Sequence, residues 1–392
     1  MQQVQPGPTP LNNLNASKNG PALAKRATKD EDPITVALVL QGGGALGAYH
    51  IGAFEALHNA GFGPDWVAGI SIGGFNAAII AGNEPANRLE KLLGFWHDIS
   101  WPEMPEHIPF LPLQILHNQI SCGEAMAFGQ PNFFSPRPIN PYLVTNAAPD
   151  NLSFYDTGAM HETLHRFASF DRINQNVTRL TLGATNIASG ILEFFDNSAQ
   201  SIDATHVLAS GSLPPGFPAT EIAGNFYWDG GCVSNTPLEA IAGAQGEGAL
   251  LVFVIDLWDA GGALPNTMNE VLWRTKQIQF AGRAWHDLKV VESVANHRHA
   301  LAIAKAAGLP EMADLPETLE LRKGQLDLVH ITFHPGRSHI ASSDADFSRS
   351  SIAARRVAGK LDMERALSQA PWTRPMPAHH RARIHPIEGV PG

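Results

Sequence analysis

The sequence predicts an α/β protein with a mostly parallel central sheet and helices on both of its faces. Short apolar runs of strand length recur along the chain, as in Ile34 to Leu40 (ITVALVL) and Ala249 to Ile255 (ALLVFVI). Runs that are apolar at every position are typical of strands buried on both faces, as parallel strands are. Glycine-rich turns and helical segments separate these runs, which favours an alternation of strands and helices.

The first fifty residues of this pattern contain two strand–turn–helix units. Strands are expected over 34–40 and 66–70, and helices of small residues over 45–60 and from 72 to 81. Glycines at 42–44 follow the first strand, and a sharp turn at Ser71 follows the second. Each strand therefore ends in a loop that opens a helix, which is the arrangement that places loops at one edge of a parallel sheet.

The rest of the chain is less regular. Residues 95–155 are rich in aromatic residues and proline without a clear period, and they are expected to form an irregular insert that covers the sheet. Further strands are expected over 177–185, 191–195, 249–255 and 326–333, with a hairpin over 221–228. Helices are expected over 237–245, over 268–307 with at most one break, and over 344–368 as an additional C-terminal helical segment.

Composition excludes several classes of protein. The 392 residues are 44% hydrophobic and 16% charged, which is enough apolar content to bury a core. The formal net charge of −10 argues against binding nucleic acid mainly through phosphate contacts and provides no broad attraction to anionic lipid. No run reaches the ~18 apolar residues of a membrane-spanning helix.

Cysteine usage and the N-terminus point to a cytoplasmic protein. Cys122 and Cys232 are the only cysteines, so no disulfide framework is possible and a reducing compartment fits. Residues 1–33 lack the apolar segment of a secretory signal and are expected to be a disordered tail.

The loop after the first strand has two interpretations. Gly42-Gly43-Gly44-Ala45-Leu46-Gly47 matches the G-x-G-x-x-G pattern of dinucleotide-binding proteins. That function needs an acidic residue at the end of the second strand, whereas this strand ends at Ile70 and Asp65 precedes it. An oxyanion hole formed by Gly42, Gly43 and Gly44 is therefore favoured, since exposed backbone N–H groups stabilise negative charge on a carbonyl oxygen.

The turn after the second strand predicts a nucleophile. Gly69-Ile70-Ser71-Ile72-Gly73 is a G-x-S-x-G pattern at a strand-to-helix junction. Small residues two positions before and after the serine let neighbouring backbone pass close to a strained turn, which lifts the hydroxyl clear of the sheet. Ser71 is the predicted nucleophile, and it needs a base.

The residues alone are compatible with two kinds of base for Ser71. In the α/β-hydrolase order an acid and then a histidine follow the serine, and many of the 17 histidines lie downstream. The serine turn comes after only two strands, however, which is early for that fold. Asp229 is the competing base, because it follows a strand and precedes Gly230 and Gly231. An ordinary Asp-Gly turn would have the same sequence.

The three patterns, in this order, resemble the patatin-like phospholipase family. Residues 42–47 correspond to its glycine-rich oxyanion loop, residues 69–73 to its G-x-S-x-G and residues 229–231 to its D-G-[GA] pattern. The flanks at 208–218 and 235–237 are also similar. One position departs from the family pattern: Leu46 stands where Arg or Lys is usual, which weakens the case for a phosphate-bearing substrate.

The resemblance implies a serine hydrolase of acyl lipids without a cofactor or a metal. Ser71 would attack an ester carbonyl, Asp229 would accept its proton directly, and water would release the acyl-enzyme. The expected supporting glycines are Gly47, Gly69, Gly73, Gly230 and Gly231. The expected partners are an acyl-ester or lipid substrate, with transient contact to a membrane surface, and no nucleic acid.

The resemblance also suggests how the chain is divided. A patatin-like catalytic domain is expected over 34–256. Residues 257–370 would be a C-terminal extension that packs on it, similar to that of a bacterial subgroup, and 371–392 a loose tail.

Two other functions are open. His161-Glu162-Thr163-Leu164-His165 matches the H-E-x-x-H pattern of zinc peptidases, in which two histidines bind the metal and the glutamate activates water. The residues after His165 do not continue that pattern with a third ligand. A catalytically inactive module that keeps the fold to bind lipid or a partner is the second alternative.

Overall fold

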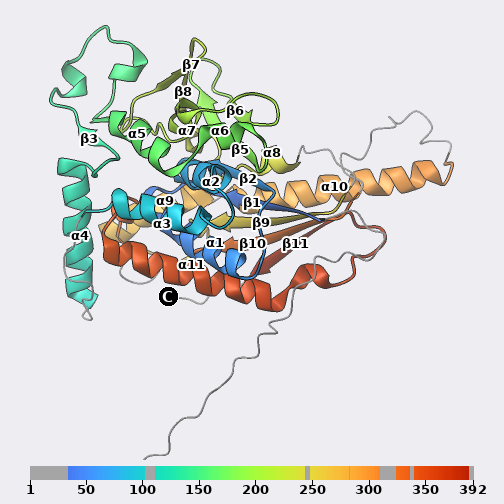
Figure 1. Ribbon diagram of the computed structural model, residues 1–392. Coiled ribbons are helices and arrows are strands. Elements are labelled where there is room, and N and C mark those ends of the chain that lie inside the picture. The colour runs from blue at the N-terminus through green and yellow to red at the C-terminus, as the bar shows by residue number, and fades with distance from the viewer. Residues whose placement is uncertain are drawn as a thin grey trace, which may run out of the picture.

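The computed structural model describes residues 34–101, 111–242, 248–281, 283–309, 324–335 and 340–387. The tail expected over 1–33 lies outside the described residues, as do 388–392. Within the described part, a nine-stranded sheet forms the centre of the molecule (Figure 1).

The sheet is mostly parallel, as predicted. Its strand order is β11-β10-β9-β1-β2-β5-β8-β7, and β6 pairs with β5 beside this path. The strands are β1 (Thr35–Leu40), β2 (Trp66–Ile70), β5 (Arg179–Asn186), β6 (Leu192–Asp196), β7 (Thr220–Ile222), β8 (Asn225–Asp229), β9 (Leu250–Asp256), β10 (Leu326–Thr332) and β11 (Ala382–Ile387). The six strands from β11 to β5 run parallel, whereas β6, β7 and β8 enter through antiparallel pairs. A separate two-stranded pair joins β3 (Ser135–Pro136) to β4 (Tyr155–Asp156).

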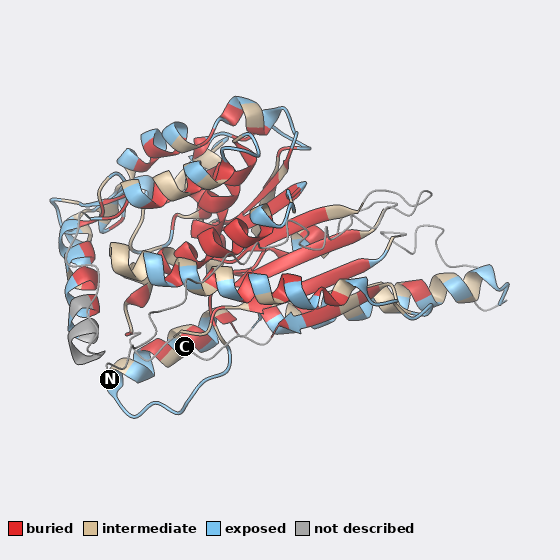
Figure 2. Ribbon diagram, turned by 60° about the horizontal axis from the view of Figure 1, so that its bottom comes forward, coloured by how far each residue is buried: buried red, intermediate tan, exposed pale blue. Residues whose placement is uncertain are grey.

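Helices cover both faces of the sheet. The helices are α1 (Ala48–Asn59), α2 (Ile72–Ala81), α3 (Arg88–Asp98), α4 (Leu111–Phe128), α5 (Gly158–Phe167), α6 (Phe170–Asn174), α7 (Ala204–Ser210), α8 (Leu238–Ala242), α9 (Met268–Ala281), α10 (Ala284–Ala306) and α11 (Arg349–Gln369). Alternation along β1 separates two cores: Leu38 and Leu40 pack with residues of α1, α2 and α11, and Ala37 and Val39 with residues of α8 and α10. Figure 2 shows the strands buried between these layers.

The C-terminal extension is built into the same sheet. Strand β10 pairs with β9 and β11 pairs with β10, both in parallel register. Helix α11 lies along α1 so closely that a Cβ on Gly359 would overlap the carbonyl oxygen of Tyr49. The extension therefore completes the sheet and one of its covering layers.

Two sequence predictions are wrong in detail. The tail expected to be loose over 371–392 contains β11, where Ala382 and Ile384 pack on one face of the sheet. The insert expected to be irregular contains α4, an 18-residue helix. The helical segment expected over 268–307 with at most one break consists of α9 and α10, which meet at one boundary. No helix among the described residues has the length and apolar character needed to cross a membrane.

Candidate active site

The C-terminal ends of β2 and β8 meet on one edge of β5. Strand β2 runs parallel to β5 and ends with Ile70 opposite Gly183, and β8 runs antiparallel and ends with Asp229 opposite Ala184. Strand β6 occupies the other edge of β5. Because Gly183 and Ala184 are consecutive, the two strands that end in Ser71 and Asp229 converge from opposite directions.

Ser71 occupies a strained turn between β2 and α2. Its backbone has φ 54° and ψ −132°, a region that favours glycine. The turn is held from one side, because the N–H of Ser71 donates to the carbonyl oxygen of Ser210 at 3.0 Å and lies 3.1 Å from its Oγ. A Cβ on Gly69 would overlap Gly73, and a Cβ on Gly73 would overlap the carbonyl oxygen of Leu40. The G-x-S-x-G glycines therefore permit the close approach that the sequence predicts.

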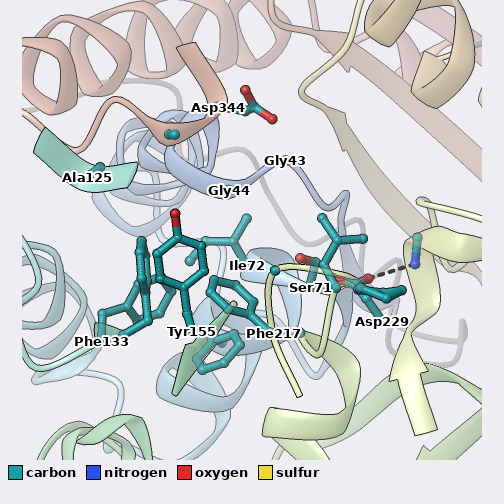
Figure 3. A pocket seen from close by; sticks show the side chains of 18 of the residues that line it. Gly43, Gly44, Ser71, Ile72, Ala125, Phe133, Tyr155, Phe217, Asp229 and Asp344 are labelled. Carbon is teal, nitrogen blue, oxygen red and sulfur yellow. Dashed lines mark hydrogen bonds between the residues drawn. The ribbon is translucent and has the colours of Figure 1, made fainter. Parts of the chain in front are cut away.

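Asp229 is a buried carboxylate beside Ser71 (Figure 3). Its Oδ1 accepts a hydrogen bond from the N–H of Gly231 at 2.7 Å, and its own N–H donates to Ser212 at 3.0 Å. Its Oδ2 is buried and makes no close hydrogen bond with the described residues. Burial raises the pKa of Asp229 to about 7, while the Ser71 hydroxyl and the Gly231 N–H act to lower it.

The carbonyl oxygen of Gly42 is held by two side chains. Asn235 Nδ2 donates to it at 2.6 Å and Trp258 Nε1 at 2.9 Å. In a planar trans peptide the C=O and the next N–H point in opposite directions. Fixing the oxygen of Gly42 therefore directs the N–H of Gly43 away from Asn235 and Trp258.

The three glycines of the predicted oxyanion loop differ in how their N–H groups are used. The N–H of Gly42 donates to the carbonyl oxygen of Asn235 at 3.0 Å, so it is not available to a substrate. Gly43 and Gly44 line the pocket and begin a short 3-10 helix, η1 (Gly44–Gly47). The first N–H groups of a helix have no partner within it. Gly44 has φ +55°, and a Cβ there would overlap the carbonyl oxygen of Asp344.

Gln41 supports this loop, although no sequence motif marks it. Its Oε1 accepts hydrogen bonds from the N–H groups of Leu257 at 2.6 Å and Trp258 at 3.1 Å, and its Nε2 donates to Thr236 Oγ1 at 2.9 Å. The available signal was a polar residue between an apolar strand and the glycines. Trp258, Ser210 and Ser212 also had no recognised role in the sequence.

Ser71 and Asp229, together with Gly43 and Gly44, line a pocket of about 520 Å³. Aromatic and apolar side chains form most of its wall, including Phe75, Phe133, Phe134, Met160, Phe217, Phe280 and Phe347. Besides Asp229, the charged residues of the described lining are Lys276 and Asp344, which form an ion pair at 2.7 and 2.8 Å. None of the described lining residues is a histidine. The size and lining suit an apolar ligand with one reacting polar group.

The C-terminal extension forms part of this pocket. Phe280, Asp344 and Phe347 all come from it. Behind η1, the buried guanidinium of Arg355 donates to the carbonyl oxygens of Ala45 at 3.0 Å and of Ser343 at 2.8 Å. The extension thus fixes the back of the oxyanion loop as well as one wall of the pocket.

Leu46 does not face the pocket. Its side chain is completely buried in the core on η1. A core side chain therefore stands where the family pattern carries a cation. Behind the loop, the guanidinium of Arg355 is bound to backbone oxygens.

The residues of the two alternative sites have the following places in the described part of the chain. His161 and His165 lie on the exposed side of α5 with ring centroids 4.8 Å apart, and no group of three or more His, Cys, Asp or Glu side chains suited to a metal occurs in the described part of the chain. Asp65 accepts a hydrogen bond from the N–H of Val36 at 2.9 Å, at the strand end opposite the glycine loop. It cannot bind a ribose there.

Fold and site together place the chain among α/β proteins that carry a serine on a strand-to-helix elbow. A model of the patatin-like phospholipase family matches residues 38–242, just over half of the chain, and the chain belongs to this family. A second family model, described as patatin phospholipase, matches residues 278–379 in the extension.

Individual relatives match only in part. Patatin-like phospholipase domain-containing protein 6 of Mus musculus and of Homo sapiens are each 47% identical over 62 residues, which is 16% of this chain and 5% or 4% of those proteins. The crystal structure of VipD from Legionella pneumophila matches at 14% identity with a TM-score of 0.33, covering 83% of this chain and 66% of that one. The ExoU–SpcU complex of Pseudomonas aeruginosa matches at 18% identity with a TM-score of 0.27, covering 72% and 59%.

Proposed function

We propose that this protein hydrolyses carboxylic esters of acyl lipids, with Ser71 as the nucleophile and Asp229 as the proton acceptor. The observation that carries the proposal is the meeting of β2 and β8 on β5, which brings a strained serine and a buried carboxylate together at the end of an apolar pocket. A pKa of about 7 suits a general base that must accept and return a proton near neutral pH.

The reaction follows from these groups. Ser71 Oγ attacks the ester carbonyl carbon, and its proton passes to the carboxylate of Asp229. The N–H groups of Gly43 and Gly44 hold the negative oxygen of the tetrahedral intermediate. When the intermediate collapses, the leaving alcohol takes the proton from Asp229, and an acyl group remains on Ser71. Water then attacks this acyl-enzyme, and Asp229 again accepts a proton. When the bond between Ser71 Oγ and the acyl carbon breaks, Asp229 returns that proton to Ser71 Oγ, and the fatty acid leaves.

The substrate class rests on the pocket wall. Aromatic and apolar side chains dominate it, and Lys276 and Asp344 neutralise each other. An acyl chain gains free energy by leaving water for such a pocket. We therefore propose that the enzyme recognises the acyl chain, and that a phosphate group is not required for binding. A cytoplasmic location and the absence of a nucleic-acid partner remain predictions from composition.

Labelling with a fluorophosphonate, followed by mass mapping of the modified peptide, tests the nucleophile. Modification of Ser71, together with hydrolysis of p-nitrophenyl esters in a chain-length panel, is expected. Modification of another serine would overturn the assignment. Turnover that a chelator abolishes and a phosphonate does not would support the zinc alternative at His161, Glu162 and His165. If the protein were neither labelled nor able to turn over an ester, an inactive binding module would be favoured.

A further inference from the structure

We propose that the protein docks on a zwitterionic lipid surface through an apolar face beside the mouth of the pocket. The docking face consists of Met126, Phe128, Ile139, Tyr142, Leu143 and Phe154, from the end of α4 and the loop between β3 and β4. Figure 1 shows both segments at the same side of the molecule, away from the central sheet. This inference rests on the proposed function, because it concerns how a lipid substrate reaches Ser71.

The exposure of the docking face is unusually large for apolar side chains. Tyr142 is 84% exposed, Leu143 77% and Phe128 69%. Single exposed apolar residues are common on soluble proteins, whereas a group of them on one face marks an interaction surface.

Specific contacts join the docking face into one surface. The rings of Tyr142 and Phe154 lie 6.0 Å apart. The hydroxyl of Tyr155, the residue after Phe154, donates to the carbonyl oxygen of Met126 at 2.7 Å. These contacts hold Tyr142 beside Phe154, and the start of β4 beside the end of α4.

The docking face continues into the pocket. Met126 and Leu213 both line the pocket, and they are 53% and 40% exposed. The N–H of Phe154 donates to the carbonyl oxygen of Pro215, another lining residue, at 3.1 Å. An acyl chain leaving a lipid layer under this face would stay in contact with apolar side chains until it reached the pocket.

Charge identifies the kind of lipid surface. Between residues 111 and 154 the only charged residues in the sequence are Glu124, Arg137 and Asp150. Arg137 donates to Ser153 Oγ at 3.0 Å and lies 3.5 Å from the carboxylate of Asp156. One cation and two acids give residues 111–154 no surplus of positive charge, so these residues provide no net attraction to anionic head groups. Insertion of Tyr142, Leu143 and Phe128 would instead depend on burial of apolar surface, as in interfacial binding.

The test separates docking from catalysis by using two assays. Co-sedimentation of the full-length Ser71→Ala protein with phosphatidylcholine vesicles measures docking without turnover. Hydrolysis of a monomeric soluble ester, p-nitrophenyl butyrate, by the otherwise unchanged protein measures catalysis alone. The test variant is Tyr142→Ser/Leu143→Ser, whose side chains do not line the pocket. The matched control is Leu264→Ser, since Leu264 is 92% exposed outside the docking face.

We expect the double variant to bind the vesicles roughly tenfold more weakly, while hydrolysing the soluble ester like the unchanged protein. Leu264→Ser should change neither quantity. Binding should be equal at 0.1 and 1 M NaCl and should not require phosphatidylglycerol in the vesicles.

Several outcomes would overturn docking. These are equal vesicle binding by the double variant, binding only to vesicles that contain phosphatidylglycerol, and binding abolished by salt. A dimer in sedimentation velocity that the double variant converts to a monomer would show instead that the face joins two copies of the chain. Absence of ester hydrolysis by the unchanged protein would contradict the proposed function, and the vesicle assay would still decide docking.

Discussion

Two hydrogen bonds join Gly42 to Asn235: Asn235 Nδ2 donates to the carbonyl oxygen of Gly42 at 2.6 Å, and the N–H of Gly42 donates to the carbonyl oxygen of Asn235 at 3.0 Å. The pair ties the loop after β1 to the segment after β8. The peptide plane that carries the N–H of Gly43 is therefore fixed by the same segment that follows Asp229. In the proposed mechanism, the base and an oxyanion donor are positioned by one stretch of chain.

Asn235→Ala is expected to lower kcat by roughly 10–100-fold, because the N–H of Gly43 would no longer be held in position. KM for a soluble ester should change little, and the pH midpoint should stay where Asp229 sets it. Asn235→Asp keeps the shape but removes the donor, so it should be similarly impaired. The measurements are steady-state kinetics on both variants, with the exposed Asn266→Ala as the control. If kcat fell only in proportion to the fraction of protein that is folded at the assay temperature, Asn235 would have a role in folding only.

Ser71→Ala and Ser71→Gly should both abolish turnover, but they should differ in stability. Only glycine adopts φ 54° and ψ −132° without strain. Ser71→Gly is therefore expected to be about 1 kcal/mol more stable than Ser71→Ala, as measured by urea unfolding. Equal stability of the two variants would show that the turn is not strained in solution.

The activity of the unchanged protein should fall as pH drops below about 7, because protonated Asp229 cannot accept the proton of Ser71. A log plot of kcat/KM against pH should show one ionisation near 7, and Asp229→Asn should be inactive across the range. A midpoint near 4 would contradict the burial of this carboxylate.

Stability should respond to the same carboxyl group with a defined sign. Burial raises its pKa in the folded state, so the folded protein holds this proton more tightly than the unfolded chain. The contribution of this carboxyl group to the free energy of unfolding is fully present below its pKa in the unfolded chain. It is lost as pH rises through about 7, the pKa in the folded protein. Between pH 4 and pH 8, the unfolding free energy of Asp229→Asn should therefore rise by roughly 2–4 kcal/mol relative to that of the unchanged protein. Urea unfolding at both pH values measures this, and a constant difference would argue against it.

The parts of the site that were predictable from sequence are the local ones. The turn at Ser71 and the glycines around it lie within five residues, and their spacing reflects contacts within one strand and one helix. Asp229 was recognisable only beside these motifs, because its place depends on β8 running against β5. Gln41 and Trp258 make contacts across more than two hundred residues, which no local pattern encodes.

The same reasoning explains the errors in the fold. Strand β11 has the sequence ARIHPI, in which proline and two polar residues obscure the apolar pattern. It forms because β10 offers an unpaired edge, a property of the assembled sheet. The N-terminal turn of α4 contains a proline, and its apolar residues follow no helical period, since several of them stay exposed.

The contact between α1 and α11 gives a test of whether the extension is integral to the fold. A Cβ on Gly359 would overlap the carbonyl oxygen of Tyr49, so Gly359→Ala must push the two helices apart. We expect this variant to lose about 2 kcal/mol of unfolding free energy, even though alanine favours a helix. Activity should fall with it, because α11 carries Arg355, which binds the carbonyl oxygen of Ala45 behind the oxyanion loop.

The matched control for this substitution is Gly123→Ala. Gly123 also lies within a helix, α4, but nothing surrounds the position of its Cβ, so alanine there should be neutral or stabilise by up to about 1 kcal/mol. Chemical unfolding followed by circular dichroism measures both variants. If Gly359→Ala and Gly123→Ala shifted the transition equally, the two helices would not be in contact, and the extension would be a separate unit. A loss confined to Gly359→Ala, with one cooperative transition, would show that the extension and the site fold together.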